Sequence, residues 1–209
     1  MKNNLKSILL LSLLLSSSTF VTNAQTLVRS GLLLNGGTGS LSPAGATLPG
    51  VPTRWTTLDY RYNLSAGYRF RLQPSLSSRW FLDLDANAGL KQWDWKDMLF
   101  APSSTNPYDY PVKETSFRYL FISAGGTVNH PVVGGLSIGA GAEAVYYRNL
   151  KGEGTRSKFD LPLVGKIAYD FGPVELGLQY KYGLMNAVRT DYIGSSKVRD
   201  WQVSVFIPF

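Results

Sequence analysis

Hydrophobic and polar residues alternate without interruption along residues 57–72. One set of alternate positions holds Leu58, Tyr60, Tyr62, Leu64, Ala66, Tyr68, Phe70 and Leu72, and the other holds Asp59, Arg61, Asn63, Ser65, Gly67, Arg69 and Arg71. Successive side chains of a β-strand point to opposite faces, so this period of two predicts a strand with one apolar and one polar face.

The same alternation predicts seven further strands. They cover residues 26–35, 80–91, 117–128, 136–147, 158–171, 174–184 and 200–209. Each has at least roughly the 9–11 residues that a tilted strand needs to cross a membrane. Pro162 lies inside one of these segments, and we expect a bulge there because proline removes a donor from the sheet.

The gaps between the eight predicted strands are alternately long and short, beginning with the long gap 36–56. An antiparallel meander with long outer loops and tight inner turns has this rhythm. The second long gap, residues 92–116, holds Trp93, Trp95, Tyr108 and Tyr110. We expect these side chains either to bind a sugar or a partner protein, or to pack over the mouth of a barrel.

Aromatic residues of the apolar faces gather near both ends of the predicted strands. Tyr60, Tyr62, Tyr146, Phe159, Tyr182 and Trp201 lie near the long gaps, and Phe70, Trp80, Phe171 and Phe209 lie near the short ones. Transmembrane barrels carry two such aromatic girdles, one at each membrane interface.

Residues 1–24 have the three-part plan of a secretory signal peptide. Lys2 and Lys6 give a positive start, residues 8–15 are apolar, and a polar stretch leads to Ala24. The apolar run is too short to span a bilayer as a helix. We therefore predict cleavage after Ala24 and one mature domain, residues 25–209.

Charge and composition argue against other classes of protein. Removing Lys2 and Lys6 lowers the 21 Lys and Arg residues to 19, which against 14 Asp and Glu leaves a net charge of +5. The basic residues form no block of the kind that nucleic-acid-binding tails carry, so we expect no nucleic-acid partner. The chain has no cysteine, which excludes disulfides and a lipid-anchored cysteine.

The last predicted strand ends the chain on an aromatic residue. Its apolar face carries Trp201, Val203, Val205, Ile207 and Phe209. This segment resembles the C-terminal signal of bacterial outer-membrane β-barrels, which the barrel-assembly machinery reads. With the signal peptide and the motif Phe117-Arg118-Tyr119-Leu120, it makes the mature chain similar to the small eight-stranded outer-membrane β-barrel family of Bacteroidota. The resemblance implies location and fold more firmly than activity.

The predicted fold class is all-β, an eight-stranded antiparallel up-and-down transmembrane β-barrel that follows a cleaved signal peptide. A soluble eight-stranded barrel of the lipocalin type shows the same alternation with its faces exchanged. Alternation alone does not separate the two. The terminal Phe209, the two aromatic girdles and the many glycines of the polar face favour the membrane barrel.

The polar face of the predicted barrel carries charges that must be paired or hydrated. We predict an interior charge network of Arg61, Arg69, Arg71, Asp83, Asp85, Glu143, Lys166 and Lys181. Within it, we expect Arg69 and Arg71 to pair with Asp83 and Asp85 of the neighbouring strand. An eight-stranded barrel is barely wide enough for its own side chains, so a plug is favoured over a charged ion path.

Arg118 and Arg148 fall on the outward face of adjacent predicted strands, near the outer rim. A guanidinium group matches the geometry of phosphate, so we expect these arginines to contact lipopolysaccharide phosphates. The alternative is ordinary snorkelling of long basic side chains at a membrane interface.

Catalysis has little support in the sequence. The only histidine, His130, lies in a predicted short turn, and there is no cysteine to complete a zinc site. We predict no catalytic residue, no metal and no cofactor.

The predicted protein is an integral outer-membrane barrel without an open pore. We expect a structural, envelope-stabilising or partner-binding role, with outer-membrane lipid, lipopolysaccharide, the barrel-assembly machinery and a protein of a larger complex as partners. The alternative is a narrow porin-like channel or carrier for small solutes. A lipid-modifying barrel enzyme or a soluble lipocalin-like binder is the third possibility.

Overall fold

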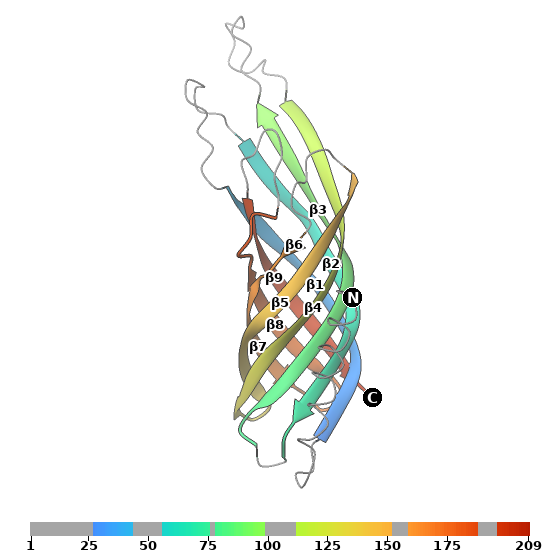
Figure 1. Cartoon of the computed structure of the whole chain (residues 1–209), viewed down its shortest axis with the longest axis vertical. Coiled ribbons are helices and arrows are strands. Elements are labelled where there is room, and N and C mark those ends of the chain that lie inside the picture. Colours follow the sequence, from blue (N-terminus) through green and yellow to red (C-terminus); the bar gives the residue numbers. More distant parts are fainter. Residues whose placement is uncertain (1–26, 44–55, 76–77, 99–111, 152–158, 188–195) are drawn as a thin grey trace, which may run out of the picture.

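Antiparallel β-strands of the described residues form one closed barrel (Figure 1). The structure is a computed structural model that describes residues 27–43, 56–75, 78–98, 112–151, 159–187 and 196–209. The strands are β1 (Leu27–Pro43), β2 (Thr56–Gln73), β3 (Phe81–Met98), β4 (Val112–Val133), β5 (Leu136–Lys151), β6 (Phe159–Asp160), β7 (Leu163–Asp170), β8 (Glu175–Tyr182) and β9 (Ser196–Pro208). The predicted signal peptide, residues 1–24, lies outside the described residues.

Apart from β6, each strand pairs with its neighbours around the barrel, and β1 also pairs with β9, which closes the sheet. β6 and β7 both pair with β5 and together make one barrel strand, so the barrel has eight strands. A closed sheet satisfies its backbone groups without an open edge. The predicted eight-stranded up-and-down barrel is therefore confirmed. Within the described residues, no helix is long and apolar enough to cross a membrane.

The sheet is interrupted at Pro162, but the interruption is not the predicted bulge. Val145 opposes Asp160, and Ala142 opposes Leu163, so two residues face two across the gap and the register is unchanged. The Pro162 carbonyl still accepts a hydrogen bond from the Glu143 amide at 3.0 Å. Proline removes only the donor, so the ladder loses a bond without gaining a residue.

Several strands extend past their predicted limits at the long-loop end, the end of the barrel that flanks the long gaps (Figure 1). β3 and β4 stay paired as far as Met98 and Val112. Trp93 and Trp95 therefore lie in β3, and the prediction that they belong to a loop is wrong. Backbone pairing continues where the regular outward row of apolar residues has already stopped at Leu90.

Tight turns close the opposite end, called the short-turn end below. Gly134 and Gly135 join β4 to β5 with φ angles of 54° and 89°. Two successive residues with positive φ fit a two-residue hairpin, and glycine adopts that conformation without steric cost. Between β7 and β8, Gly172 has a φ of 95°, and its amide donates to the Asp170 carboxylate at 2.7 Å.

The apolar face of the sheet points outward. Outward side chains such as Leu64, Ile122 and Val203 are 56–57% exposed, whereas the intervening positions are buried inside the barrel. Polar and charged side chains fill most of that interior. This arrangement is the reverse of a lipocalin-type soluble barrel, whose interior is apolar, and it is the arrangement of a transmembrane barrel.

Aromatic side chains face outward near both ends, as the girdle prediction requires, with one exception. The exposed members are Tyr146, Phe159 and Trp201 near the long-loop end, and Phe70, Trp80, Phe171 and Phe209 near the short-turn end. The exception is Tyr60, which points into the barrel and donates a hydrogen bond to Asp200 at 2.8 Å.

Candidate functional site

An ion network fills the barrel interior toward the short-turn end. Arg71 lies opposite Asp83, and Arg69 lies opposite Asp85, in the register between β2 and β3. Arg69 binds Asp85 through two hydrogen bonds of 2.7 and 2.8 Å. Arg71 binds Asp83 in the same way at 2.7 and 3.0 Å. Both pairs are therefore bidentate, the strongest arrangement for arginine and carboxylate, and both confirm the predicted pairing.

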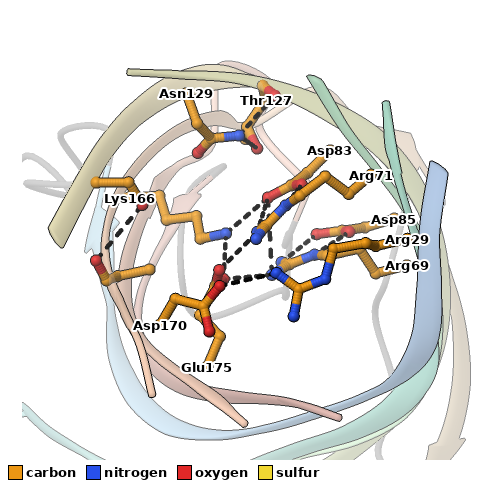
Figure 2. A network of polar contacts seen from close by, with 12 residues as sticks. Arg29, Arg69, Arg71, Asp83, Asp85, Thr127, Asn129, Lys166, Asp170 and Glu175 are labelled. Carbon is orange, nitrogen blue, oxygen red and sulfur yellow. Dashed lines mark hydrogen bonds and ion pairs between the residues drawn. The ribbon is translucent and has the colours of Figure 1, made fainter. Parts of the chain in front are cut away.

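Residues from the far side of the barrel complete this network. Lys166 of β7 lies 2.8 Å from Asp83 and 2.9 Å from Glu175 of β8. Glu175 in turn lies 3.0 Å from Arg69 and 2.6 Å from Arg71. Figure 2 shows these contacts crossing the lumen. We call these three cations and three carboxylates the ion network. Its members, which balance in charge, are Arg69, Arg71, Lys166, Asp83, Asp85 and Glu175.

The ion network is almost completely buried. Its six side chains are 0–6% exposed, except Asp85 at 17%. Aromatic rings cover the guanidinium groups: Arg71 lies 4.1 Å from the ring centroid of Phe81, and Arg69 lies 5.2 Å from that of Phe206. A buried charge is tolerated when it is paired and hydrogen-bonded, and every member of the network is.

The predicted members Glu143 and Lys181 pair with each other instead of joining the ion network. Their atoms Oε2 and Nζ are 2.6 Å apart. A further layer lies toward the long-loop end, where the Lys91 ammonium and the Tyr60 hydroxyl both donate to the Asp200 carboxylate. The interior therefore contains separate layers of ion pairs rather than one continuous network.

The prediction that Arg61 lies in the interior is wrong. The register shifts between Tyr60 and Tyr62, so Arg61 is an extra residue on β2. Its side chain is 53% exposed and forms an ion pair with Asp94, whose side chain is 5% exposed. A bulge of this kind puts all residues beyond it on the opposite face, which also explains why Tyr60 points inward.

An aromatic cap closes the interior at the long-loop end. It consists of Trp93, Phe117, Tyr119, Phe121, Val145, Tyr147, Ala187 and Val198, all buried. Trp93 stacks on Tyr119 with ring centroids 4.7 Å apart. Sequence analysis missed this cap because the predicted strands stopped short of Trp93.

Among the described residues, cavities lie between the ion network and the aromatic cap, and two of them are well defined. Their volumes are about 10 and 20 Å³, and both are lined by Glu143 and Lys181. Each cavity has room for about one water molecule. Neither is a passage for a hydrated solute.

The outer surface carries the other predicted residues. Arg118 and Arg148 are exposed on the outward face of β4 and β5, as predicted. Two nitrogens of Arg118 donate to the Gln92 side-chain oxygen at 3.0 and 3.2 Å. The predicted assembly signal, Trp201, Val203, Val205, Ile207 and Phe209, forms the outward face of β9, with Phe209 79% exposed.

The described residues contain no cluster of three or more metal-ligating side chains. His130 lies on the outer surface at the short-turn end, where its Nδ1 is 2.5 Å from the Arg79 carbonyl oxygen. The candidate sites are thus the interior filled by charged side chains and a basic outer rim.

The fold and the two faces define a transmembrane β-barrel. No family model and no curated protein matches the chain. The resemblance to the Bacteroidota family therefore stays a prediction.

Solved structures of small outer-membrane barrels are similar to it. Neisserial surface protein A has a TM-score of 0.49 and 15% identity, with 86% of this chain and 97% of that chain covered. OprG from Pseudomonas aeruginosa has a TM-score of 0.47 and 11% identity, with 88% of this chain and 92% of that chain covered. Ail of Yersinia pestis, solved with a heparin analogue, has a TM-score of 0.43 and 11% identity, with 87% of this chain and 99% of that chain covered. At this level of similarity the neighbours carry no argument about ligand or role.

Proposed function

We propose that the chain is an integral outer-membrane β-barrel protein without an open pore, with a structural, envelope-stabilising or partner-binding role. The outward apolar face supports the membrane location, because exposed apolar area on this scale is stable only against lipid. The ion network carries the second half of the proposal. Its contacts from Asp83 to Lys166 and from Glu175 to Arg69 and Arg71 span the lumen, which supports a barrel without an open pore.

A heat-modifiability gel on outer-membrane fractions tests the location and the closed barrel. A closed barrel resists SDS until it is boiled and migrates faster when unheated, because it offers no open strand edge. We expect a mobility shift in the outer-membrane fraction. A protein found in the soluble periplasmic fraction without a shift would overturn the proposal.

The channel alternative is tested by conductance in planar bilayers. We expect no discrete openings from the unchanged protein, because the ion network and the aromatic cap both obstruct the lumen. An open porin measured in the same bilayers is the positive control. Discrete openings from the unchanged protein would favour the porin-like channel.

We propose no catalytic activity for this barrel. The layers of ion pairs hold their carboxylates against cations, and His130 lies on the outer surface, whereas Glu143 and Asp200 are buried inside the barrel. Incubation of the reconstituted protein with labelled phospholipid and lipopolysaccharide tests the point. A modified lipid product that depends on the protein would favour the enzyme alternative.

We also propose that Arg118 and Arg148 contact lipopolysaccharide phosphates. Leu120 lies opposite Arg148 on β5, so the two arginines are diagonal neighbours on the outer surface. Gln92 orients the Arg118 guanidinium, which reduces the entropy lost on binding. The double variant Arg118→Ala and Arg148→Ala should co-purify with less lipopolysaccharide, whereas Arg79→Ala at the other rim should not. If the unchanged protein, the double variant and Arg79→Ala co-purify with equal amounts of lipopolysaccharide, snorkelling is the explanation that stands.

The exposed face of β9 supports a role in assembly. We propose that the barrel-assembly machinery reads Trp201, Val203, Val205, Ile207 and Phe209 during insertion. The proposed partner proteins would bind at the long-loop end. The predicted long gaps include residues 44–55, 99–111, 152–158 and 188–195, which lie outside the described residues.

A further inference from the structure

A second basic cluster lies on the outer surface at the long-loop end, over the ring of Tyr182. Tyr182 and Arg199 lie directly opposite each other on β8 and β9. The Arg199 Cζ atom is 5.1 Å from the ring centroid, and the Lys197 Nζ atom is 6.0 Å from it. Both cations come from the same face of β9, two residues apart, and they converge on one aromatic ring.

These two cations have no carboxylate partner among the described residues. Asp200, the nearest acid in sequence, points into the barrel and pairs with Lys91. On the other side of β9, the residues opposite Arg199 and Lys197 are Ser40 and Ser42 of β1. Within the part of the chain that the structure describes, the Nε atom of Arg199 is buried and has no hydrogen-bond partner, so the remaining guanidinium nitrogens are the ones a ligand would meet. The arrangement differs from Arg61, whose charge Asp94 already compensates.

The cluster lies next to an outward aromatic pair, on the side of the long-loop end. Trp201 and Tyr180 are the next outward residues toward the middle of the barrel, and their ring centroids are 4.6 Å apart. Trp201 is 51% exposed. Such aromatic pairs mark the level of the lipid headgroups in transmembrane barrels. Arg199 and Lys197, farther along β9, are therefore placed beside the headgroups of the outer leaflet.

We propose that Lys197, Arg199 and Tyr182 form a binding site for the phosphate of an anionic glycolipid headgroup. The proposal rests on the outer-membrane location proposed above. Arg199 supplies a planar set of donors, Lys197 supplies a compact charge, and the Tyr182 ring holds both in place. The exposed hydroxyl of Ser40 lies beside them as an additional donor.

This site is separate from Arg118 and Arg148. Those arginines lie on β4 and β5, and the barrel strand made of β6 and β7 stands between β5 and β8. Two independent basic clusters would let the barrel contact more than one headgroup and fix its depth in the outer leaflet. The two clusters should therefore respond independently to substitution.

Binding is measured on the full barrel reconstituted in phosphatidylcholine vesicles that contain bis-phosphorylated lipid A. Vesicles with dephosphorylated lipid A and added inorganic phosphate serve as comparison arms. The variants are Lys197→Ala with Arg199→Ala, and Arg79→Ala as the matched control at the short-turn end. Each basic residue near a membrane surface contributes roughly a fivefold change in affinity, so the double variant should bind about 25-fold more weakly.

Loss of binding in the double variant, with the control and the heat-modifiability shift unchanged, supports the site. Unchanged affinity of the double variant in a normally inserted barrel overturns the site but leaves the proposed function standing. Equal competition by inorganic phosphate, or equal binding of dephosphorylated lipid A, overturns the glycolipid phosphate as ligand. Failure of the unchanged protein to insert overturns the proposed function as well.

Discussion

Asp83→Asn tests whether the ion network stabilises the barrel. Asp83 is fully buried and accepts hydrogen bonds from Arg71 at 2.7 and 3.0 Å and from Lys166 at 2.8 Å. Arg69 lies 3.7 Å away. The amide keeps the size of the carboxylate but removes its charge, which leaves three cations against the two remaining carboxylates of the network. Removing one partner of a buried ion pair costs about 3–5 kcal/mol, because the other charge is left uncompensated.

Asp170→Asn is the matched control. Asp170 also pairs with an arginine, Arg29, at 2.8 Å, but these side chains are 28% and 41% exposed. Solvent screens such a pair, and its loss costs about 0–1 kcal/mol. Unfolding in urea, followed by tryptophan fluorescence on the barrel in phosphatidylcholine vesicles, gives both free energies of unfolding. Similar losses for the two variants would refute the reasoning, because they would mean that water screens the interior network as well.

A second variant separates charge balance from other effects of the substitution. Lys166→Gln in the Asp83→Asn background again balances the network, with two arginines against Asp85 and Glu175. We expect this double variant to recover part of the stability that Asp83→Asn loses. If the double variant loses as much free energy of unfolding as the two single variants lose together, the two charges are not coupled.

Two further predictions concern folding and assembly. Gly141→Val should prevent folding in vesicles, because a Cβ there would lie 1.9 Å from the Gly126 carbonyl oxygen, whereas Gly165→Val has open space and should fold normally; the unheated gel band measures both. Phe209→Ala should lower the amount of barrel in the outer membrane several-fold, while Phe171→Ala, also exposed at the short-turn end, should not, as immunoblots of the membrane fraction would show. Equal levels of the two phenylalanine variants would speak against Phe209 as part of an assembly signal.

The number and direction of the strands follow from local patterns that the sequence displays. Alternation sets the faces of Leu64 to Leu72, and the glycines of the turn at Gly134 need no distant contact to adopt positive φ. The pairs Arg69 with Asp85 and Arg71 with Asp83 were also predictable, because they join strands that are neighbours in sequence.

Other features depend on information that alternation does not carry. The bulge at Arg61 interrupts neither the hydrophobic pattern nor the strand, so the sequence pattern placed Tyr60 and Arg61 on the wrong faces. The place of Glu175 at the centre of the ion network depends on the tilt and stagger of the closed barrel. Contacts across the lumen are set by closure, which no single strand determines.

The most direct test asks which face of the sheet meets lipid. Two single-tryptophan variants keep either Trp201, 51% exposed on the outside, or Trp93, fully buried in the aromatic cap, with every other tryptophan replaced by phenylalanine. Both are folded into vesicles of brominated phosphatidylcholine, which quenches fluorescence on contact. We expect strong quenching of Trp201 and little of Trp93. Failure to quench Trp201 would contradict the transmembrane barrel and favour a soluble barrel of the lipocalin type.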